Sequence, residues 1–284
     1  MDGEPPWKIP PLAPADSSGS IAAGVRLLVL PDAAAVAEQV AATLLREALR
    51  PQHRPLGLAT GRTMEPVYAA LNRQLHALET AAAERLRRSW CSFNLDDYVG
   101  LAPTDPRSFA AEMAARLVDP LDLEPAAVHL PDGLAADPEA EAARYRQALE
   151  AAGGIGLQLL GLGLNGHVGF NEPPCSAEAP CRVVMLSPST REQNAGTFGG
   201  DPAAVPERAI TLGLREILAA ERLLLVVTGA AKAEVLARVL QEPPIPELPA
   251  SWLQHHPRAL VVVDAAAATA LDPCRLPAAA PEQR

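Results

Sequence analysis

Short runs of consecutive apolar residues alternate along the chain with segments whose apolar residues recur at helical spacing. The runs lie at residues 25–30, 56–59, 91–95, 157–162, 222–228 and 259–264. Residues 32–50, and the residues from about 65 onward, have the spacing of helices that bury one face. Continuous apolar strands separated by helices predict an α/β fold with a mostly parallel sheet that is buried on both faces.

Both ends of the chain depart from this pattern because proline, serine and glycine are frequent there. Residues 1–22 predict a flexible N-terminal arm, and residues 273–284 predict a similar C-terminal tail. The 284 residues suffice for one or two domains, and no internal repeat divides them. We therefore expect a single α/β domain over residues 23–272.

The net charge and the lysine content indicate which kinds of molecule the protein could bind. The chain has 24 lysines and arginines against 34 acidic residues, a formal net charge of −10. This balance argues against a nucleic-acid partner, which needs a basic face. A small anionic ligand remains compatible, because one pocket can oppose the overall charge. Lys8 and Lys232 are the two lysines, and Lys232 is the one outside the expected arm.

The sequence indicates neither a metal site nor a membrane segment. The four cysteines form no CxxC pair and no zinc-ligand spacing, so no metal is expected. The first residues lack the basic and apolar regions of a secretory signal. Asp264 interrupts the longest apolar stretch, residues 259–271. We therefore expect a cytoplasmic protein without a membrane partner.

Polar residues follow four of the predicted strands, at the ends where ligands bind in open parallel sheets. After the first of these strands come Thr60, Gly61, Arg62 and Thr63. Glycine permits a tight turn, and hydroxyl groups and a helix N-terminus favour an anion such as phosphate. The alternative is an ordinary helix start with Thr63 as its N-cap. Spacing alone leaves both interpretations open.

Two adjacent carboxylates, Asp96 and Asp97, end the strand predicted at residues 91–95. One of them could point into a cleft and act as a general base. A solvated turn is the alternative, because aspartate is common in turns.

A glycine-rich segment at residues 161–173 contains the spacing GxGxxG. A dinucleotide-binding fingerprint opens a helix, whereas Gly169 and two prolines follow here, so we reject that interpretation. An amide, an imidazole and a carboxylate remain within eight residues, at Asn165, His167 and Glu172. A histidine and a glutamate placed together can relay a proton near neutral pH. A structural histidine is the alternative.

Residues 228–232 (TGAAK) again have the order strand, glycine turn, helix, and place Lys232 in the first helical turn. A lysine there opposes the helix dipole. The position is understandable if the lysine and the backbone amides bind a phosphate together. A surface lysine is the alternative.

Together these segments resemble the family of glucosamine/galactosamine-6-phosphate isomerases, which includes deaminases and 6-phosphogluconolactonases. The chain lacks the arginine after the strand-end acids and the GGDGHTASLFP-like loop of the lactonases, which favours the deaminase branch. The resemblance covers residues 24–270, with the matching pieces LGLATGRT (56–63), FNLDDYVGL (93–101), GLGLNGHVGFNEP (161–173), STR (189–191) and TGAAK (228–232).

The resemblance implies a Rossmann-like α/β fold, with helices on both faces of the sheet. It also implies conversion of glucosamine 6-phosphate to fructose 6-phosphate and ammonia, in amino-sugar catabolism, without a metal or an organic cofactor. Asp96 would move the proton from C2 to C1. His167, supported by Asn165 and Glu172, would assist the opening of the sugar ring.

The same resemblance implies a small-molecule sugar phosphate as the ligand. Its phosphate would contact Thr60, Gly61, Arg62, Thr63 and Lys232. A sugar-phosphate lactonase, or an isomerase acting on another phosphosugar, is the alternative function. The state of association stays open, a homo-oligomer included.

Three positions depart from the family pattern. Gly196 stands where relatives commonly carry a phosphate-binding arginine, which Arg62 or Arg191 could replace. Val184 stands where allosterically regulated relatives carry a basic residue, so activation by N-acetylglucosamine 6-phosphate is not expected. Asn165 stands where some relatives have aspartate, so an amide rather than a charge would orient the histidine.

Overall fold

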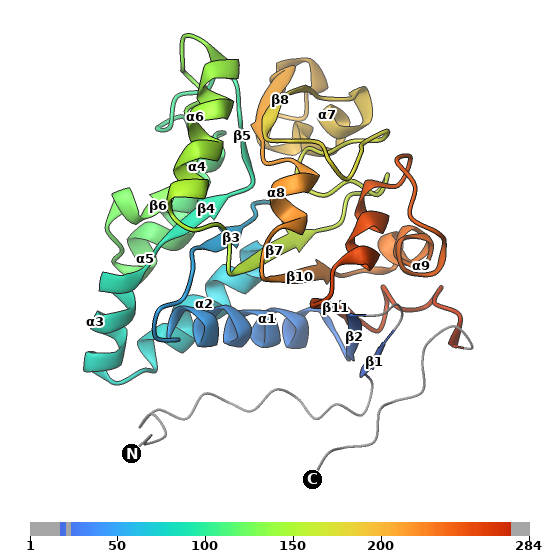
Figure 1. The fold of residues 1–284 in the computed structure, drawn as a ribbon, viewed down its shortest axis with the longest axis horizontal. Coiled ribbons are helices and arrows are strands. Elements are labelled where there is room, and N and C mark those ends of the chain that lie inside the picture. The colour runs from blue at the N-terminus through green and yellow to red at the C-terminus, as the bar shows by residue number, and fades with distance from the viewer. Residues whose placement is uncertain (1–17, 21–23, 274–284) are drawn as a thin grey trace.

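The computed structural model describes residues 18–20 and 24–273, and eight strands form its central sheet (Figure 1). In spatial order these strands are β1 (Ser18–Ser20), β2 (Val25–Leu30), β11 (Ala259–Asp264), β10 (Arg222–Val227), β7 (Leu157–Gly161), β3 (Leu56–Leu58), β4 (Ser92–Asn94) and β6 (Val128–His129). β1 pairs with β2 antiparallel, and every other neighbouring pair is parallel. The mostly parallel sheet is therefore confirmed, and its predicted strands agree with the observed ones to within one or two residues.

Helices cover both faces of this sheet. Residues 223–227 of β10 and 261–264 of β11 are all buried, and successive side chains of a strand point to opposite faces. Both faces must therefore be covered. The α-helices in the described part of the chain, some of which pack on the second sheet instead, are α1 (Ala33–Ala48), α2 (Glu65–His76), α3 (Thr80–Ser89), α4 (Phe109–Met113), α5 (Asp119–Leu121), α6 (Pro138–Ala151), α7 (Pro188–Asn194), α8 (Leu214–Leu218) and α9 (Ala233–Gln241).

A second, antiparallel sheet has no counterpart in the sequence-based prediction. It consists of β5 (Asp96–Tyr98), β9 (Arg208–Thr211) and β8 (Arg182–Met185). β5 follows β4 after one residue, so the apolar pattern of residues 91–95 does not reveal a change of sheet. β8 lies beside α7 at the end of the molecule away from α1 (Figure 1).

Aromatic residues pack this smaller sheet against its surroundings. The ring of Tyr98 lies 4.8 Å from that of Phe109 and 5.6 Å from those of Phe170 and Phe198, measured between centroids. Burial of such large side chains stabilises a core strongly. The cluster therefore fixes α4 and the short 3-10 helix at Ala195–Phe198 to β5.

The winding of the chain locates a crevice in the central sheet. From β3 the chain proceeds outward to β4 and β6, and from β7 it proceeds in the opposite direction to β10 and β11. β3 and β7 are neighbours, so the winding reverses between them. Ligands of open α/β sheets bind beyond the carboxyl ends of strands at such a point. The polar segments at residues 60–63 and 162–170 both lie there.

The predicted arm is described only in part. Ser18–Ser20 form β1, which pairs with β2 at the edge of the sheet. Residues 1–17 and 21–22 of the predicted arm lie outside the described residues. Residues 274–284 of the predicted tail also lie outside them. Among the residues that are described, no helix is long and apolar enough to cross a membrane.

Candidate active site

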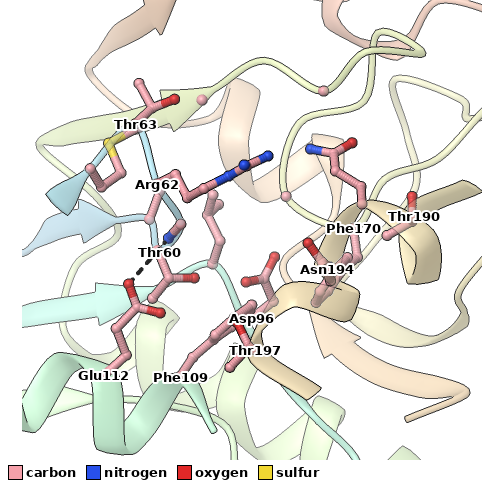
Figure 2. A pocket seen from close by; sticks show the side chains of 18 of the residues that line it. Thr60, Arg62, Thr63, Asp96, Phe109, Glu112, Phe170, Thr190, Asn194 and Thr197 are labelled. Carbon is pink, nitrogen blue, oxygen red and sulfur yellow. Dashed lines mark hydrogen bonds between the residues drawn. The ribbon is translucent and has the colours of Figure 1, made fainter. Parts of the chain in front are cut away.

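A cavity of about 540 Å³ occupies the crevice at the carboxyl ends of β3, β4, β7 and β10. Figure 2 shows Thr60, Arg62 and Thr63 on one side of it and Thr190, Asn194 and Thr197 on the other, with Asp96 between. The predicted site residues that line the cavity are Thr60, Gly61, Arg62, Thr63, Asp96, His167 and Lys232. Asn165 and Glu172 do not line it.

The loop after β3 adopts the tight turn that its glycine predicts. Gly61 has a φ of +102°, a value that glycine reaches without strain, and its carbonyl accepts a hydrogen bond from Met64 N at 2.8 Å. The N-cap residue of α2 is Met64, and no side chain caps this helix. The N-cap interpretation of Thr63 is therefore wrong, and Thr63 lines the cavity instead.

The two adjacent aspartates have different surroundings. Asp96 lines the cavity and is 5% exposed, and Thr211 Oγ1 donates to its Oδ2 at 3.5 Å. Burial, followed by the negative charge of Asp97, raises the pKa of Asp96 to about 8. A carboxyl group with such a pKa suits proton transfer near neutral pH.

Asp97 instead holds the start of α4. Its Oδ1 accepts hydrogen bonds from the backbone N–H groups of Tyr98 at 2.7 Å and Phe109 at 3.0 Å. Its Oδ2 accepts a third from Ala110 N at 2.9 Å. Burial raises the pKa of Asp97 to about 6, against the effect of these hydrogen bonds. Asp97 is a structural residue, and Asp96 is the candidate base.

His167 lies in the loop after β7 with its imidazole ring against Gly163, where a Cβ would overlap the ring. Burial lowers the pKa of His167 to about 4. The charge of Glu172 opposes this shift and that of Lys232 adds to it. The buried Nδ1 has no hydrogen-bond partner within the described part of the chain. The ring is therefore neutral near pH 7 and can accept a proton.

The two residues expected to support His167 contact other groups. Asn165 Oδ1 accepts a hydrogen bond from His167 N at 3.2 Å, so it holds the backbone of the loop rather than the ring. Glu172 Oε1 accepts from Ser187 N at 3.1 Å, next to α7. Glu172 influences the imidazole through its charge.

Lys232 brings a second cation to the cavity. It ends the 3-10 turn at Ala230–Lys232, one residue before α9, and so lies just outside the helical turn that the sequence predicts for it. Burial, followed by the charge of Arg62, lowers the pKa of Lys232 to about 8. Two cations thus lie close enough to influence each other and could hold one anion between them.

Arg191 does not replace the missing arginine at position 196. Its Nη2 donates to Ala203 O at 3.2 Å, and it is not among the described residues that line the cavity. Gly196 does line the cavity, and a Cβ there would meet nothing within 4 Å. Of the two suggested substitutes, only Arg62 reaches the site.

Sequence reasoning missed Arg107 and Glu112. Both line the cavity. Arg107 lies over the ring of Phe198 at 5.5 Å and binds Asp105 through two contacts, of 2.8 and 2.6 Å. Glu112 receives a hydrogen bond from Gly61 N. For Arg107, the acid two residues earlier at Asp105 is a weak sequence signal of an ion pair. For Glu112, nothing in the sequence indicates a contact with Gly61, which lies 51 residues earlier.

A carboxyl group, an imidazole and two cations at the strand ends of a Rossmann-like sheet form a site with the groups needed to move protons on a small anion. The chain belongs to the family of glucosamine-6-phosphate isomerases and 6-phosphogluconolactonases, whose model matches residues 31–262.

Named relatives support this assignment. The chain is 40% identical over 248 residues to a glucosamine-6-phosphate deaminase of Rhodopirellula baltica, covering 87% of this chain and 96% of the relative. It is 40% identical over 249 residues to the deaminase of Streptomyces coelicolor, covering 87% of this chain and 93% of that relative.

Solved structures agree on the fold. A monomeric glucosamine-6-phosphate deaminase superposes with a TM-score of 0.81 at 34% identity, covering 86% of this chain and 99% of that structure. The 6-phosphogluconolactonase of Leishmania guyanensis has a TM-score of 0.68 at 19% identity, covering 87% of this chain and 98% of that structure. The second likeness shows the fold alone.

Proposed function

We propose that this protein converts glucosamine 6-phosphate and water to fructose 6-phosphate and ammonia. The observation that carries the proposal is the placement of Asp96, a buried carboxyl group with a raised pKa, in the cavity that also contains His167 and Lys232. Relatives about 40% identical over most of the chain bear the name glucosamine-6-phosphate deaminase.

Ring opening is the first step. His167 accepts the proton of the C1 hydroxyl group and returns one to the ring oxygen, which breaks the bond between C1 and that oxygen. A neutral imidazole is required for this step, and the lowered pKa of His167 provides it. Asn165 positions the loop, and Glu172 stabilises the imidazolium that forms transiently.

Isomerisation and loss of ammonia follow. The carboxylate of Asp96 removes the proton from C2 and returns it to C1. The aldehyde oxygen on C1 gains a proton that the C2 ammonium group gives up, so the products of this step are a C1 hydroxyl group and an iminium at C2. Water adds to C2 and ammonia leaves, so the reaction is hydrolytic. A positioned general base contributes about 10²–10⁴-fold to such a proton transfer.

The phosphate group occupies the other end of the cavity in this proposal. Thr60, Gly61 and Thr63 offer hydroxyl and amide donors, and Arg62 and Lys232 offer positive charge. We place the reaction in the cytoplasmic breakdown of amino sugars such as those derived from N-acetylglucosamine, with residues 23–272 as the catalytic domain.

The test is a substrate panel with two product measurements. Purified protein given glucosamine 6-phosphate should release ammonia and fructose 6-phosphate in equal amounts, and 6-phosphogluconolactone should be turned over no faster than in buffer. Lactone hydrolysis without ammonia release would replace the proposal with the lactonase alternative.

A further inference from the structure

The loop that would hold the substrate phosphate already contacts a carboxylate of the protein. Gly61 N donates a hydrogen bond to Glu112 Oε1 at 3.4 Å, and Figure 2 shows this contact beside Thr60. Glu112 belongs to α4 and lines the cavity. An internal anion therefore occupies an amide that a bound phosphate would need.

The charge of Glu112 is only partly compensated. Arg116 Nε lies 3.3 Å from Glu112 Oε1, and Nη2 of the same guanidinium lies 2.9 Å from Glu65 Oε1. One arginine is thus shared between two carboxylates. The side chain of Glu112 is 21% exposed, against 41% for Glu65, so water screens Glu112 less.

Few positive charges at this end of the cavity oppose that carboxylate. Among the described residues that line the cavity the basic side chains besides His167 are Arg62, Arg107 and Lys232. Asp105 binds the guanidinium of Arg107 through two contacts. Gly196 contributes no charge. Arg62 and Lys232 therefore remain to hold an anion, with Glu112 acting against them.

We infer that Glu112 determines specificity at the C6 end of the substrate, by opposing a dianionic phosphate and accepting a hydrogen bond from an uncharged C6 hydroxyl group. This inference rests on the proposed function. A phosphate that approaches Gly61 meets the Glu112 charge and competes with it for the N–H group. A hydroxyl group meets neither obstacle. The enzyme therefore prefers phosphorylated over unphosphorylated amino sugars less strongly than it would if Arg62 and Lys232 acted without the charge of Glu112.

The test compares wild-type protein with Glu112→Gln. The amide keeps an oxygen for Gly61 N and removes the charge, and Arg116 keeps Glu65 as its partner, so the fold should persist. A unit charge a few ångströms from a phosphate at intermediate dielectric changes its affinity on the order of tenfold. The expected result is a KM for glucosamine 6-phosphate about tenfold lower, without a gain in kcat/KM for glucosamine.

Glu65→Gln is the matched control. Glu65 also lines the cavity and shares Arg116, but its side chain is 41% exposed and, among the described residues, has no hydrogen bond to the Gly61 loop, so water screens its charge more. The substitution removes the same charge, and its effect on the ratio of kcat/KM for glucosamine 6-phosphate to kcat/KM for glucosamine should stay within about twofold. A ratio unchanged or lowered in Glu112→Gln would overturn the inference, as would an equal rise in both variants. If Glu112→Gln is unstable, Glu112→Met removes the charge at similar volume and carries the same test.

Binding of inorganic phosphate, measured by calorimetry, separates this inference from the proposed function. Tighter phosphate binding by Glu112→Gln supports the inference even if no variant releases ammonia, a result that would refute the deaminase proposal alone. Ammonia release together with an unchanged phosphate Kd would refute the inference and leave the proposed function standing.

Discussion

The imidazole ring of His167 lies against Gly163, and a Cβ at that position would overlap the ring. Gly163 is thus required by the close approach of a side chain rather than by an unusual backbone angle. The contact also contributes to the burial that lowers the pKa of His167. The position of the histidine therefore depends on a residue that carries no chemical group of its own.

Gly163→Ala should displace the ring and reduce turnover. A shift of about 1 Å in a catalytic group can cost on the order of 100-fold in rate, so we expect kcat for glucosamine 6-phosphate to fall by about that factor. Steady-state kinetics measures the loss of turnover, and thermal unfolding shows whether the variant is still folded. An unchanged kcat in the folded variant would show that the ring position is not important for catalysis.

Asp97→Ala should destabilise the fold. The substitution leaves two backbone N–H groups at the start of α4, those of Phe109 and Ala110, and the N–H group of Tyr98 in β5 without their acceptor. Lost caps and buried unpaired donors cost about 1–3 kcal/mol, which denaturant unfolding would detect as a lower free energy of unfolding. Asp96→Asn is the control, because Asp96 accepts no such set of backbone bonds. If Asp96→Asn lowered the free energy of unfolding more than Asp97→Ala, the assignment of Asp97 as the structural residue and Asp96 as the catalytic one would be contradicted.

Lys232→Ala should raise the KM for glucosamine 6-phosphate far more than the KM for glucosamine. A hydrogen bond to a charged group contributes about 1.5–3 kcal/mol, which corresponds to roughly 10- to 100-fold. Lys232 is cationic below its pKa of about 8 and neutral above it. The wild-type KM for the phosphosugar should therefore rise as the pH increases through 8, and Lys232→Arg should remove that rise. Equal effects on both sugars would exclude Lys232 from the phosphate site.

Gly196→Arg should strengthen phosphate binding. Position 196 lines the cavity in a 3-10 turn, has no left-handed backbone angle, and leaves open space around a Cβ. A guanidinium there could bind phosphate through two hydrogen bonds, and we expect KM for glucosamine 6-phosphate to fall about tenfold. Gly196→Gln, of similar length but uncharged, should leave KM nearly unchanged. A similar gain in both variants would point to packing instead of charge.

The apolar runs in the sequence were sufficient to predict the parallel sheet and the end of it that contains the cavity. They could not show that β5 leaves this sheet, because Asp96 and Asp97 continue the chain beyond β4 without a break in pattern. The sequence alone also does not distinguish the roles of Asp96 and Asp97. Asp97 differs because it accepts hydrogen bonds from the backbone N–H groups of residues 109–110, which come near only in the folded chain.

Long-range contacts account for the other omissions. Glu112 meets Gly61 through the packing of α4, and local spacing contains no trace of that pairing. The sequence offers Arg191 as a substitute for the absent arginine because it is near position 196 along the chain, yet its side chain donates to Ala203 O. The four polar segments were predictable because strand ends place them together, whereas the direction of each side chain depends on packing.

The central claim is that Asp96 transfers the proton between C2 and C1. It is tested most directly by ammonia release from glucosamine 6-phosphate in wild-type protein and in Asp96→Asn, with substrate binding measured by calorimetry in both. We predict that the variant binds the substrate with an affinity within a few-fold of wild type and releases ammonia about 10²–10⁴ times more slowly. Ammonia release at the wild-type rate by Asp96→Asn would contradict the account.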